Sequence, residues 1–240
     1  MSIPFFYSPD IVSNGGYMEM DEENARHIVQ VLRMKAGDAI KLTDGRGNTS
    51  QCMISAAGKK SCTVIIQSHT TIPAPAHKVT IAISLLKNTN RFEWFLEKAA
   101  ETGIHRVVPL LCHRTERQIF RESRAKSILV SAMLQSQQSW LTEISSPVGF
   151  SQFIATLDGD IYENAYIAHC DDCEKKELAS IIHKQHHSSL VIIGPEGDFT
   201  QEEIGAAIAA GCQPVQLGET RLRTEAAGLT AAVLLRQLGG

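Results

Sequence analysis

The sequence lacks the marks of several large classes of protein. No run of apolar residues in the 240-residue sequence approaches the roughly 18 uninterrupted residues of a membrane-spanning helix. The N-terminal MSIPFFYSPD has no basic region and no long apolar core, so no signal peptide is expected. The six cysteines are scattered, which is typical of a reducing compartment rather than of a disulfide scaffold. We therefore expect a cytoplasmic protein without a membrane anchor.

An overall excess of basic residues is also absent, since the net charge is -3. A nucleic-acid-binding domain usually shows a strong basic balance. The charge is unevenly distributed, however. Residues 87–126 contain nine Lys and Arg against five Asp and Glu, whereas residues 150–190 contain three against seven. A protein with one basic and one acidic region can still hold RNA locally.

The N-terminal part of the chain is predicted to be a small β-rich domain. Strands are expected at Val31-Leu32, 39–42 and 62–67, with a turn at 44–48 and a short helical segment at 21–31. Two prolines within residues 70–75 favour extended chain. We therefore predict a domain over residues 1–70, a linker over 71–77 and a second domain over 78–240.

The second domain alternates strand and helix patterns. Strands are predicted at 79–86, 106–111, 166–169, 191–193 and 214–217, and helices at 91–102, 123–140, 174–186, from about 201, and 226–238. This alternation indicates an α/β fold with a mostly parallel sheet covered on both faces. No G-x-G-x-x-G follows the first strand, so a dinucleotide site is unsupported.

A Gly-Pro-Glu-Gly turn at residues 194–197 follows the β-branched run 191–193. Thr200 and Glu203 have capping-box spacing, and Phe199 and Ile204 fit a hydrophobic staple, so a helix should begin at about residue 201. Acidic residues crowd that helix end and would repel a phosphate. A neutral or cationic ligand, held partly by backbone groups, fits this loop better than a nucleotide triphosphate.

A second loop runs from Leu217-Gly218 to Arg223-Thr224-Glu225-Ala226 and leads into an apolar helix. Core packing does not call for an arginine and a glutamate at the head of such a helix. The two segments GPEGDF and LGETRLRTEAA, in this order, resemble the signature of the RsmE family. That family methylates N3 of one uridine in 16S ribosomal RNA and belongs to the SPOUT superfamily.

The resemblance implies a trefoil-knotted SPOUT methyltransferase domain, an N-terminal PUA-like β-barrel, S-adenosylmethionine as methyl donor, and a homodimer acting on 16S rRNA or the small ribosomal subunit. Uracil N3 must lose a proton to become nucleophilic, which requires a base or a group that stabilises the anion. Glu225 is the candidate base and Arg223 the candidate stabilising group, and the alternative is that the pair braces the loop. The cofactor-binding residues implied are His169, Gly194, Pro195, Glu196, Gly197, Leu217, Gly218, Leu222, Arg223, Thr224 and Ala226.

Two basic loops follow the first and second strands of the second domain, at the edge where open sheets place their ligands. Lys87 and Arg91 lie in one loop, and Arg114 and Arg117 lie in the other. Arginine there pairs with phosphate or stacks on bases, so we interpret these residues as RNA contacts. Arg33 is a further candidate in the N-terminal domain. The alternative for each is a solvated charge.

Two segments of the second domain carry unusual residues. The segment 132–136 matches the family, but many members have Glu where Leu134 stands and Arg near Gln138. Methylation of another rRNA or tRNA nucleotide, or RNA binding without catalysis, therefore stays open. Cys170 and Cys173 lie near His183 and His186, but the spacing is too short for a standard zinc finger, so no metal is expected.

Overall fold

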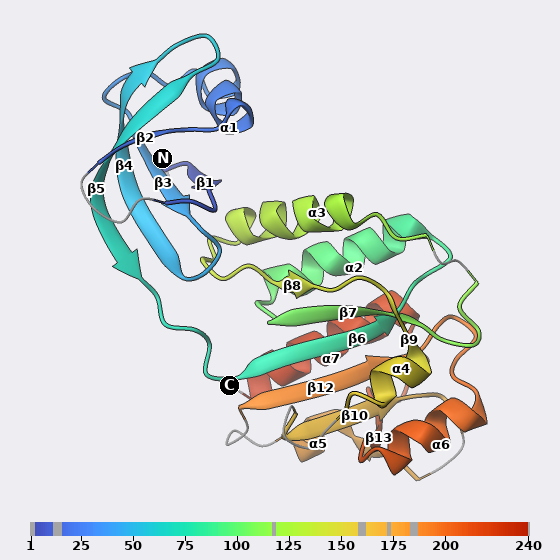
Figure 1. Ribbon diagram of the computed structural model, residues 1–240. Coiled ribbons are helices and arrows are strands. Elements are labelled where there is room, and N and C mark those ends of the chain that lie inside the picture. The colour runs from blue at the N-terminus through green and yellow to red at the C-terminus, as the bar shows by residue number, and fades with distance from the viewer. Residues whose placement is uncertain are drawn as a thin grey trace. The chain divides into compact units, whose positions relative to one another are not determined.

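The computed structural model describes residues 3–11, 16–116, 119–157, 162–171, 174–182 and 187–239. Its chain divides into two compact units, whose elements are labelled in Figure 1. The N-terminal unit comprises Met1–Ala74 and Met133–Leu141, and the C-terminal unit comprises Pro75–Ala132 and Thr142–Gly240. The predicted division at residues 71–77 places residues 133–141 in the second domain, whereas the structure groups them with the N-terminal unit.

The N-terminal unit is built on a mixed five-stranded sheet in the order β1-β3-β4-β5-β2. Its strands are β1 (Phe5–Tyr7), β2 (Tyr17–Glu19), β3 (Ala39–Thr43), β4 (Asn48–Ala57) and β5 (Cys62–Thr71). Among the pairings of the described strands in this sheet, only β1–β3 is parallel. One core face carries Phe6, Ile28, Ile40, Leu42, Ile54 and Val64. The predicted small β-rich domain is confirmed.

The short helical segment at 21–31 is also confirmed, as α1 (Glu22–Arg26) and the π-helical turn η1 (His27–Val31). Asp21 caps α1 by accepting a hydrogen bond from Asn24 N. The strand predicted at Val31-Leu32 is wrong. The Leu32 amide donates to the His27 carbonyl at 3.0 Å, which continues the helical turn, and Val31 is largely exposed.

A glycine-containing turn explains how residues 133–141 join the N-terminal unit. A Cβ at Gly47 would lie 2.6 Å from the Trp140 ring, and the φ of Gly47 is +89°, so only glycine fits there. The Gly47 amide donates to the Ser139 carbonyl, and the indole of Trp140 donates to the Ile72 carbonyl at 3.1 Å. The turn at 44–48 was therefore predicted correctly, but its packing partner was not.

The C-terminal unit contains a parallel eight-stranded sheet in the order β11-β13-β10-β12-β6-β7-β8, with β9 also pairing with β7. The strands are β6 (Lys78–Ser84), β7 (Arg106–Leu111), β8 (Glu143–Ile144), β9 (Val148–Gly149), β10 (Asn164–Ala168), β11 (Lys176–Glu177), β12 (Ser188–Ile193) and β13 (Gln213–Gln216). Strand β13 inserts between β10 and β11, which are neighbours in sequence. The trefoil knot stays a prediction.

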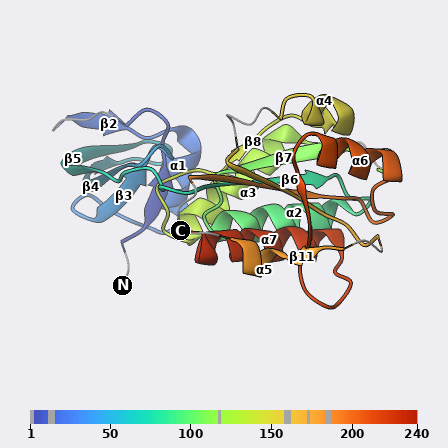
Figure 2. The same ribbon diagram turned by 90° about the horizontal axis from the view of Figure 1, so that it is seen from below.

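Helices cover both faces of this sheet, as predicted (Figure 2). The helices α2 (Thr89–Glu101), α5 (Leu178–Ile181) and α7 (Thr224–Leu238) lie on one face. The helices α4 (Phe150–Ile154) and α6 (Gln201–Ala209) lie on the other, and share a core with Ala82, Leu110 and Ile192. Gly228 of α7 lies so close to Phe95 that an added Cβ would be 2.7 Å from the ring. This packing fixes the head of α7 against α2.

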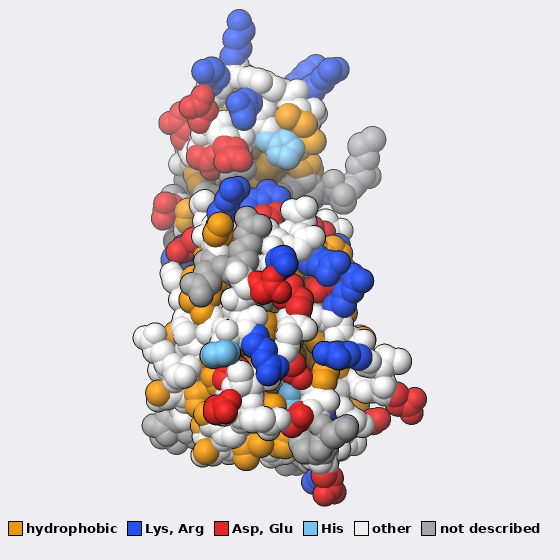
Figure 3. All heavy atoms as spheres, turned by 90° about the vertical axis from the view of Figure 1, so that its right-hand side faces the viewer, with side chains coloured by type: hydrophobic (Ala, Val, Ile, Leu, Met, Phe, Trp, Pro, Cys, Tyr) orange, Lys and Arg blue, Asp and Glu red, His pale blue; other side chains and the backbone are white. Residues whose placement is uncertain are grey.

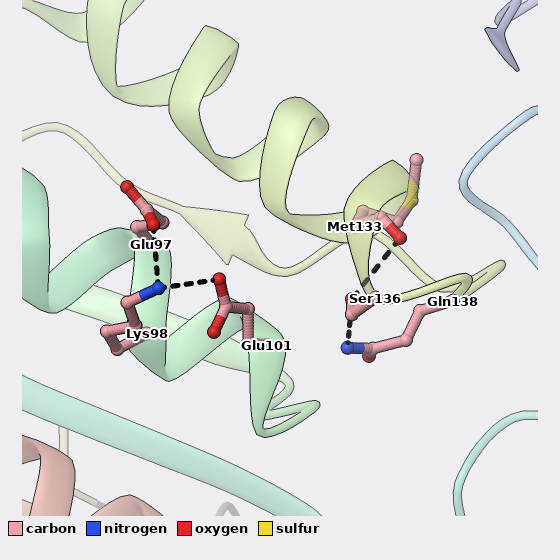
Figure 4. Close-up of polar contacts among 6 residues, drawn as sticks. All are labelled: Glu97, Lys98, Glu101, Met133, Ser136 and Gln138. Carbon is pink, nitrogen blue, oxygen red and sulfur yellow. Dashed lines mark hydrogen bonds and ion pairs between the residues drawn. The ribbon is translucent and has the colours of Figure 1, made fainter. Parts of the chain in front are cut away.

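Two predicted helices end differently from the expectation. Helix α3 spans Glu122–Gln135 instead of continuing to residue 140. Gln137 has φ +58°, and Gln138 Nε2 donates to Ser136 Oγ, which itself donates to the Met133 carbonyl (Figure 4). Within the described residues of 174–186, β11 and the single turn α5 replace the predicted long helix. No helix among the described residues is long and apolar enough to cross a membrane.

Candidate active site

A cavity of about 730 Å³ opens at the carboxyl ends of β10, β12 and β13. Ligands of open parallel sheets bind at the carboxyl ends of the strands. Figure 3 shows the molecule from the side toward which β6 and β12 run in Figure 1. The lining residues are Ala168, His169, Cys170, Asp171, Lys175, Ile193, Gly194, Pro195, Glu196, Asp198, Val215, Gln216, Leu217, Gly218, Glu219, Thr220, Arg221, Leu222, Arg223, Thr224 and Ala227. Both predicted loops therefore contribute walls to one cavity.

The first wall is the loop of residues 194–200, which follows β12. Its turn is closed by a hydrogen bond from the Asp198 amide to the Pro195 carbonyl at 2.9 Å, with φ +63° at Asp198. A Cβ at Gly194 would lie 3.0 Å from the Phe199 ring, so glycine lets the buried ring pack under the turn. The Asp198 carboxylate accepts a hydrogen bond from the Cys170 amide at 2.8 Å. The wall is thereby tied to the end of β10.

The capping box that was predicted at the end of this loop is confirmed. Glu203 N donates to Thr200 Oγ1 at 3.2 Å, and Thr200 N donates to Glu203 Oε2 at 3.0 Å. Phe199 and Ile204 are both buried in one cluster, as the hydrophobic staple requires. Helix α6 begins at Gln201, where the spacing placed it.

The two basic loops of the same sheet edge reach this wall. The Lys87 amide donates to Glu196 Oε1 at 3.2 Å. Arg114 Nη1 donates to the carbonyls of Gly197 at 2.7 Å and Phe199 at 3.2 Å. Lys87 Nζ also forms an ion pair with Glu116 at 2.6 Å. The structure therefore brings three loops together that are far apart in the sequence, whereas Arg117 lies outside the described residues.

The second wall is the loop of residues 217–223, which follows β13. Gly218 has φ +136°, a backbone conformation that is strained for any residue with a Cβ. Arg223 precedes α7 as its N-cap residue and does not cap the helix with its side chain. Within the described part of the chain, no side chain of this loop makes a hydrogen bond or an ion pair.

His169 forms the floor between these walls and is buried, with 7% of its surface exposed. The Asp171 amide donates to His169 Nδ1 at 3.3 Å, which places the proton of the neutral ring on Nε2. Burial lowers the pKa of His169 below its ordinary 6.5, and the nearby Lys175 lowers it further. Lys175 Nζ is anchored by the carbonyls of His169 and Asp171 at 2.8 and 2.6 Å. The imidazole is therefore neutral at physiological pH.

Comparison with known families agrees with this geometry. Residues 73–236 match the RNA methyltransferase domain family, and residues 21–67 match the RNA methyltransferase PUA domain. The chain belongs to the RNA methyltransferase family. The resemblance deduced from GPEGDF and LGETRLRTEAA is confirmed, and so is the assignment of the N-terminal unit as a PUA domain.

Individual members of the family match over most of their length. Ribosomal RNA small subunit methyltransferase E of a Synechocystis strain is 29% identical over 88% of this chain and 70% of its own. A probable rRNA-methyltransferase structure from Porphyromonas gingivalis is 36% identical, with a TM-score of 0.89 over 98% of each chain. A Neisseria gonorrhoeae ribosomal RNA small subunit methyltransferase E bound to S-adenosyl methionine is 26% identical, with a TM-score of 0.88 over 99% and 98% of the chains.

Among the residues predicted for this RNA methyltransferase site, Glu225 lies apart from the cavity lining. It is 8% exposed, and its Oε1 lies 3.7 Å from Nε of Arg91. Its Oε2 is buried without a hydrogen-bond donor among the described residues. The pair joins the head of α7 to α2, so Glu225 is placed to brace this helix through Arg91 and not through Arg223, as the alternative had it. Arg91, which was predicted to contact RNA, is half-buried in this pair.

Most of the predicted cofactor residues line the cavity, but Gly197 and Ala226 do not. Gly197 faces Arg114, whose Cδ would lie 3.4 Å from an added Cβ. Ala227, one position further along α7, takes the place expected for Ala226. Their roles as cofactor contacts stay predictions. Arg33 lies in the N-terminal unit, exposed, with φ +55°.

Sequence reasoning missed several lining residues that follow β10, notably Cys170, Asp171 and Lys175. They lie in the stretch that was weighed as a metal site, and their position after a central strand was the signal that they line a cavity. Within the described residues, no group of three or more His, Cys, Asp or Glu is arranged to hold a metal ion. Cys173, His183 and His186 lie outside the described residues.

Proposed function

We propose that this chain transfers a methyl group from S-adenosylmethionine to N3 of a uridine in 16S rRNA of the small ribosomal subunit. The observation that carries the proposal is the cavity formed jointly by the GPEG loop and the loop of residues 217–223. Its support from relatives is that the Synechocystis and Neisseria proteins bear the name ribosomal RNA small subunit methyltransferase E.

The cavity suits a cationic methyl donor. Its volume of about 730 Å³ falls within the roughly 300–1,000 Å³ typical of small-molecule sites. The lining holds four carboxylates against three cations, a small negative excess that is compatible with a sulfonium; these residues are Asp171, Glu196, Asp198 and Glu219, and Lys175, Arg221 and Arg223. At Gly218 an added Cβ would meet no atom within 4 Å, so no other part of the chain covers the backbone there. Gly194, Pro195, Leu217 and Leu222 supply main-chain and apolar contacts.

When bound, S-adenosylmethionine supplies an electrophilic methyl on a cationic sulfur. The chain's residues must then bring the uracil into line and stabilise the negative charge that develops when N3 loses its proton. Arg223 lines the cavity and is exposed, so its guanidinium is free to approach a uracil carbonyl oxygen. Glu225 acts through Arg91 as a brace that holds the head of α7, and with it Arg223, in place.

The basic edge provides the RNA surface. We assign phosphate contacts to Lys87 and to Arg117 on the sequence evidence, and to Arg33 in the PUA domain. The chain works as a homodimer in the cytoplasm. Leu134 and Gln138, which depart from the family pattern, favour a different target nucleotide as the second candidate function.

The test is methyl transfer from labelled S-adenosylmethionine to small-subunit rRNA, followed by mapping of the modified nucleotide. Arg223→Ala should lower kcat about 100-fold while the Kd of the cofactor changes less than about threefold. The kcat of Arg223→Lys should lie between those of the wild type and Arg223→Ala, because lysine keeps the charge and loses the planar guanidinium. A methyl group on another nucleotide would establish the second candidate, and absence of transfer by the wild-type protein would refute both.

Glu225→Gln separates the brace from the base. A brace predicts a loss of transfer smaller than about tenfold, because the amide keeps the shape and an acceptor. A general base predicts a loss of about 100-fold or more. A loss of methyl transfer of about 100-fold or more, with cofactor binding intact, would show that Glu225 is the general base predicted from the sequence.

A further inference from the structure

Arg114 is an exposed residue whose guanidinium nevertheless binds back to the protein. Its Nη1 donates to two carbonyls of the first wall, those of Gly197 at 2.7 Å and Phe199 at 3.2 Å. These two carbonyls flank Asp198, whose positive φ gives the turn its shape. A guanidinium that holds both peptide groups fixes the direction in which Asp198 and Glu196 present themselves to the cavity.

Arg114 also packs against residue 197. An added Cβ there would lie 3.4 Å from Arg114 Cδ and 3.5 Å from its Cβ. Gly197 is not among the cavity-lining residues. These distances are ordinary van der Waals contacts, so the aliphatic part of Arg114 packs against the Gly197 position outside the cavity lining.

The loop that carries Arg114 is itself fixed. The His113 amide donates to Glu203 Oε1 at 2.8 Å, so the capping glutamate of α6 also holds this loop. Thr115 is buried and shares a hydrogen bond of 2.9 Å with Ser84, and the Cys112 amide donates to its hydroxyl at 2.8 Å. Arg114 thus acts from a rigid base at the ends of β6 and β7.

We infer that Arg114 is a positioning residue for the cofactor-binding wall and not a phosphate contact. This inference rests on the proposed function, because it takes S-adenosylmethionine as the ligand of that wall. Charge-assisted hydrogen bonds to two carbonyls are stronger than neutral ones, and their loss frees the turn. The consequence is that Arg114 controls affinity for the methyl donor although it lies outside the cavity lining.

The experiment compares Arg114→Ala with Arg124→Ala in the full chain. Arg124 of α3 pairs with Glu93 of α2 at 2.9 Å and has no hydrogen bond to the wall. Its replacement by alanine therefore removes one positive charge, as Arg114→Ala does, but at a different site. Calorimetry with S-adenosylmethionine should show a Kd raised about tenfold to thirtyfold for Arg114→Ala, and a change below about twofold for Arg124→Ala. The salt dependence of RNA binding should be the same for Arg114→Ala as for the wild type.

The opposite pattern would overturn the inference. If Arg114 contacts a phosphate, the Kd for S-adenosylmethionine stays at the wild-type value and the salt slope of RNA binding falls by about one. Arg114→Lys gives a second measurement should the alanine variant unfold. Lysine keeps the charge for a phosphate but replaces Nη1, which donates both hydrogen bonds, with an ammonium on a shorter side chain. Weakened cofactor binding with normal RNA binding therefore supports positioning. A wild-type protein that binds no S-adenosylmethionine refutes the proposed function itself.

Discussion

Residues 194–200 receive hydrogen bonds from the loops that follow β6, β7 and β10, whereas residues 217–223 receive none at their side chains within the described structure. Both loops follow strands of one sheet, β12 and β13, and both line the same cavity. The difference lies in their surroundings. The first loop is bonded to other loops of the sheet edge, and the second leads directly into α7.

This contrast assigns the loops different tasks. A wall held by several hydrogen bonds is formed before a ligand arrives, which lowers the ordering cost of binding. A wall without such bonds is free to adjust, and loops that move around ligands come from the least stabilised parts of a structure. We expect residues 194–200 to be a preformed wall and residues 217–223 to settle on the methyl donor.

The largest effect is expected from breaking the fixed wall at Glu203. Glu203→Ala leaves the amides of Thr200 and His113 without their acceptor, and both hydrogen bonds are partly buried. We expect the variant to lower the free energy of unfolding by about 2–4 kcal/mol. For a unit of this size that corresponds to roughly 5–15 °C in Tm. Glu202→Ala is the matched control, because Glu202 is exposed on the same helical turn. Equal Tm values for the two variants would show that Glu203 does not fix the wall.

Gly218→Ala probes the free wall and should act on binding instead of stability. A Cβ at φ +136° costs about 1–3 kcal/mol, and the unfastened loop can relieve this strain by changing conformation. We expect the Kd for S-adenosylmethionine to rise about fivefold to 100-fold with nearly unchanged Tm. A variant that binds as tightly as wild type would mean that the left-handed backbone at Gly218 is not needed in the complex.

Gly205→Ala is the corresponding control within α6. An added Cβ there meets no atom within 4 Å and the position is helical, so helix propensity should raise the free energy of unfolding by about 0.5–1 kcal/mol. Chemical denaturation measures this gain. A destabilised Gly205→Ala would indicate that glycine substitutions in this unit are generally harmful, and the result at Gly218 would lose its meaning.

The smallest effect concerns the buried His169. Since its folded pKa is lowered, the unfolded chain binds the proton first as the pH falls, and stability is lost below about the ordinary value of 6.5. Thermal melts between pH 7.5 and 5.5 should therefore show a steeper fall in Tm for wild type than for His169→Asn. His105, whose pKa is also lowered by burial, remains in both proteins as a common background. Parallel pH profiles would contradict the neutral, buried imidazole.

Local chemistry explains which parts of the fold the sequence predicted. The capping box of Thr200 and Glu203 and the buried strand 191–193 are set by residues close together in the chain, and both were located correctly. Strand β4 was missed because its buried positions include Thr49, Ser50 and Cys52, which give no apolar alternation.

Tertiary partners explain the rest. The sequence placed Arg114 and Arg91 in basic loops, but nothing local shows that the first binds the carbonyls of Gly197 and Phe199, or that the second pairs with Glu225. The sequence interpretation was RNA contact for both, with solvated charge as the alternative. The motif glycines and Arg223 could be found because their unusual residue types stand out at strand and helix ends.

Amide hydrogen exchange with and without S-adenosylmethionine tests the contrast between the two walls most directly. We predict that the Asp198 amide, bonded to the Pro195 carbonyl, is protected in both states. Amides of residues 217–223 should exchange rapidly in the free protein and become protected when the cofactor is bound. Equal protection of the two loops in the free protein, or no change in residues 217–223 at saturating cofactor, would contradict it.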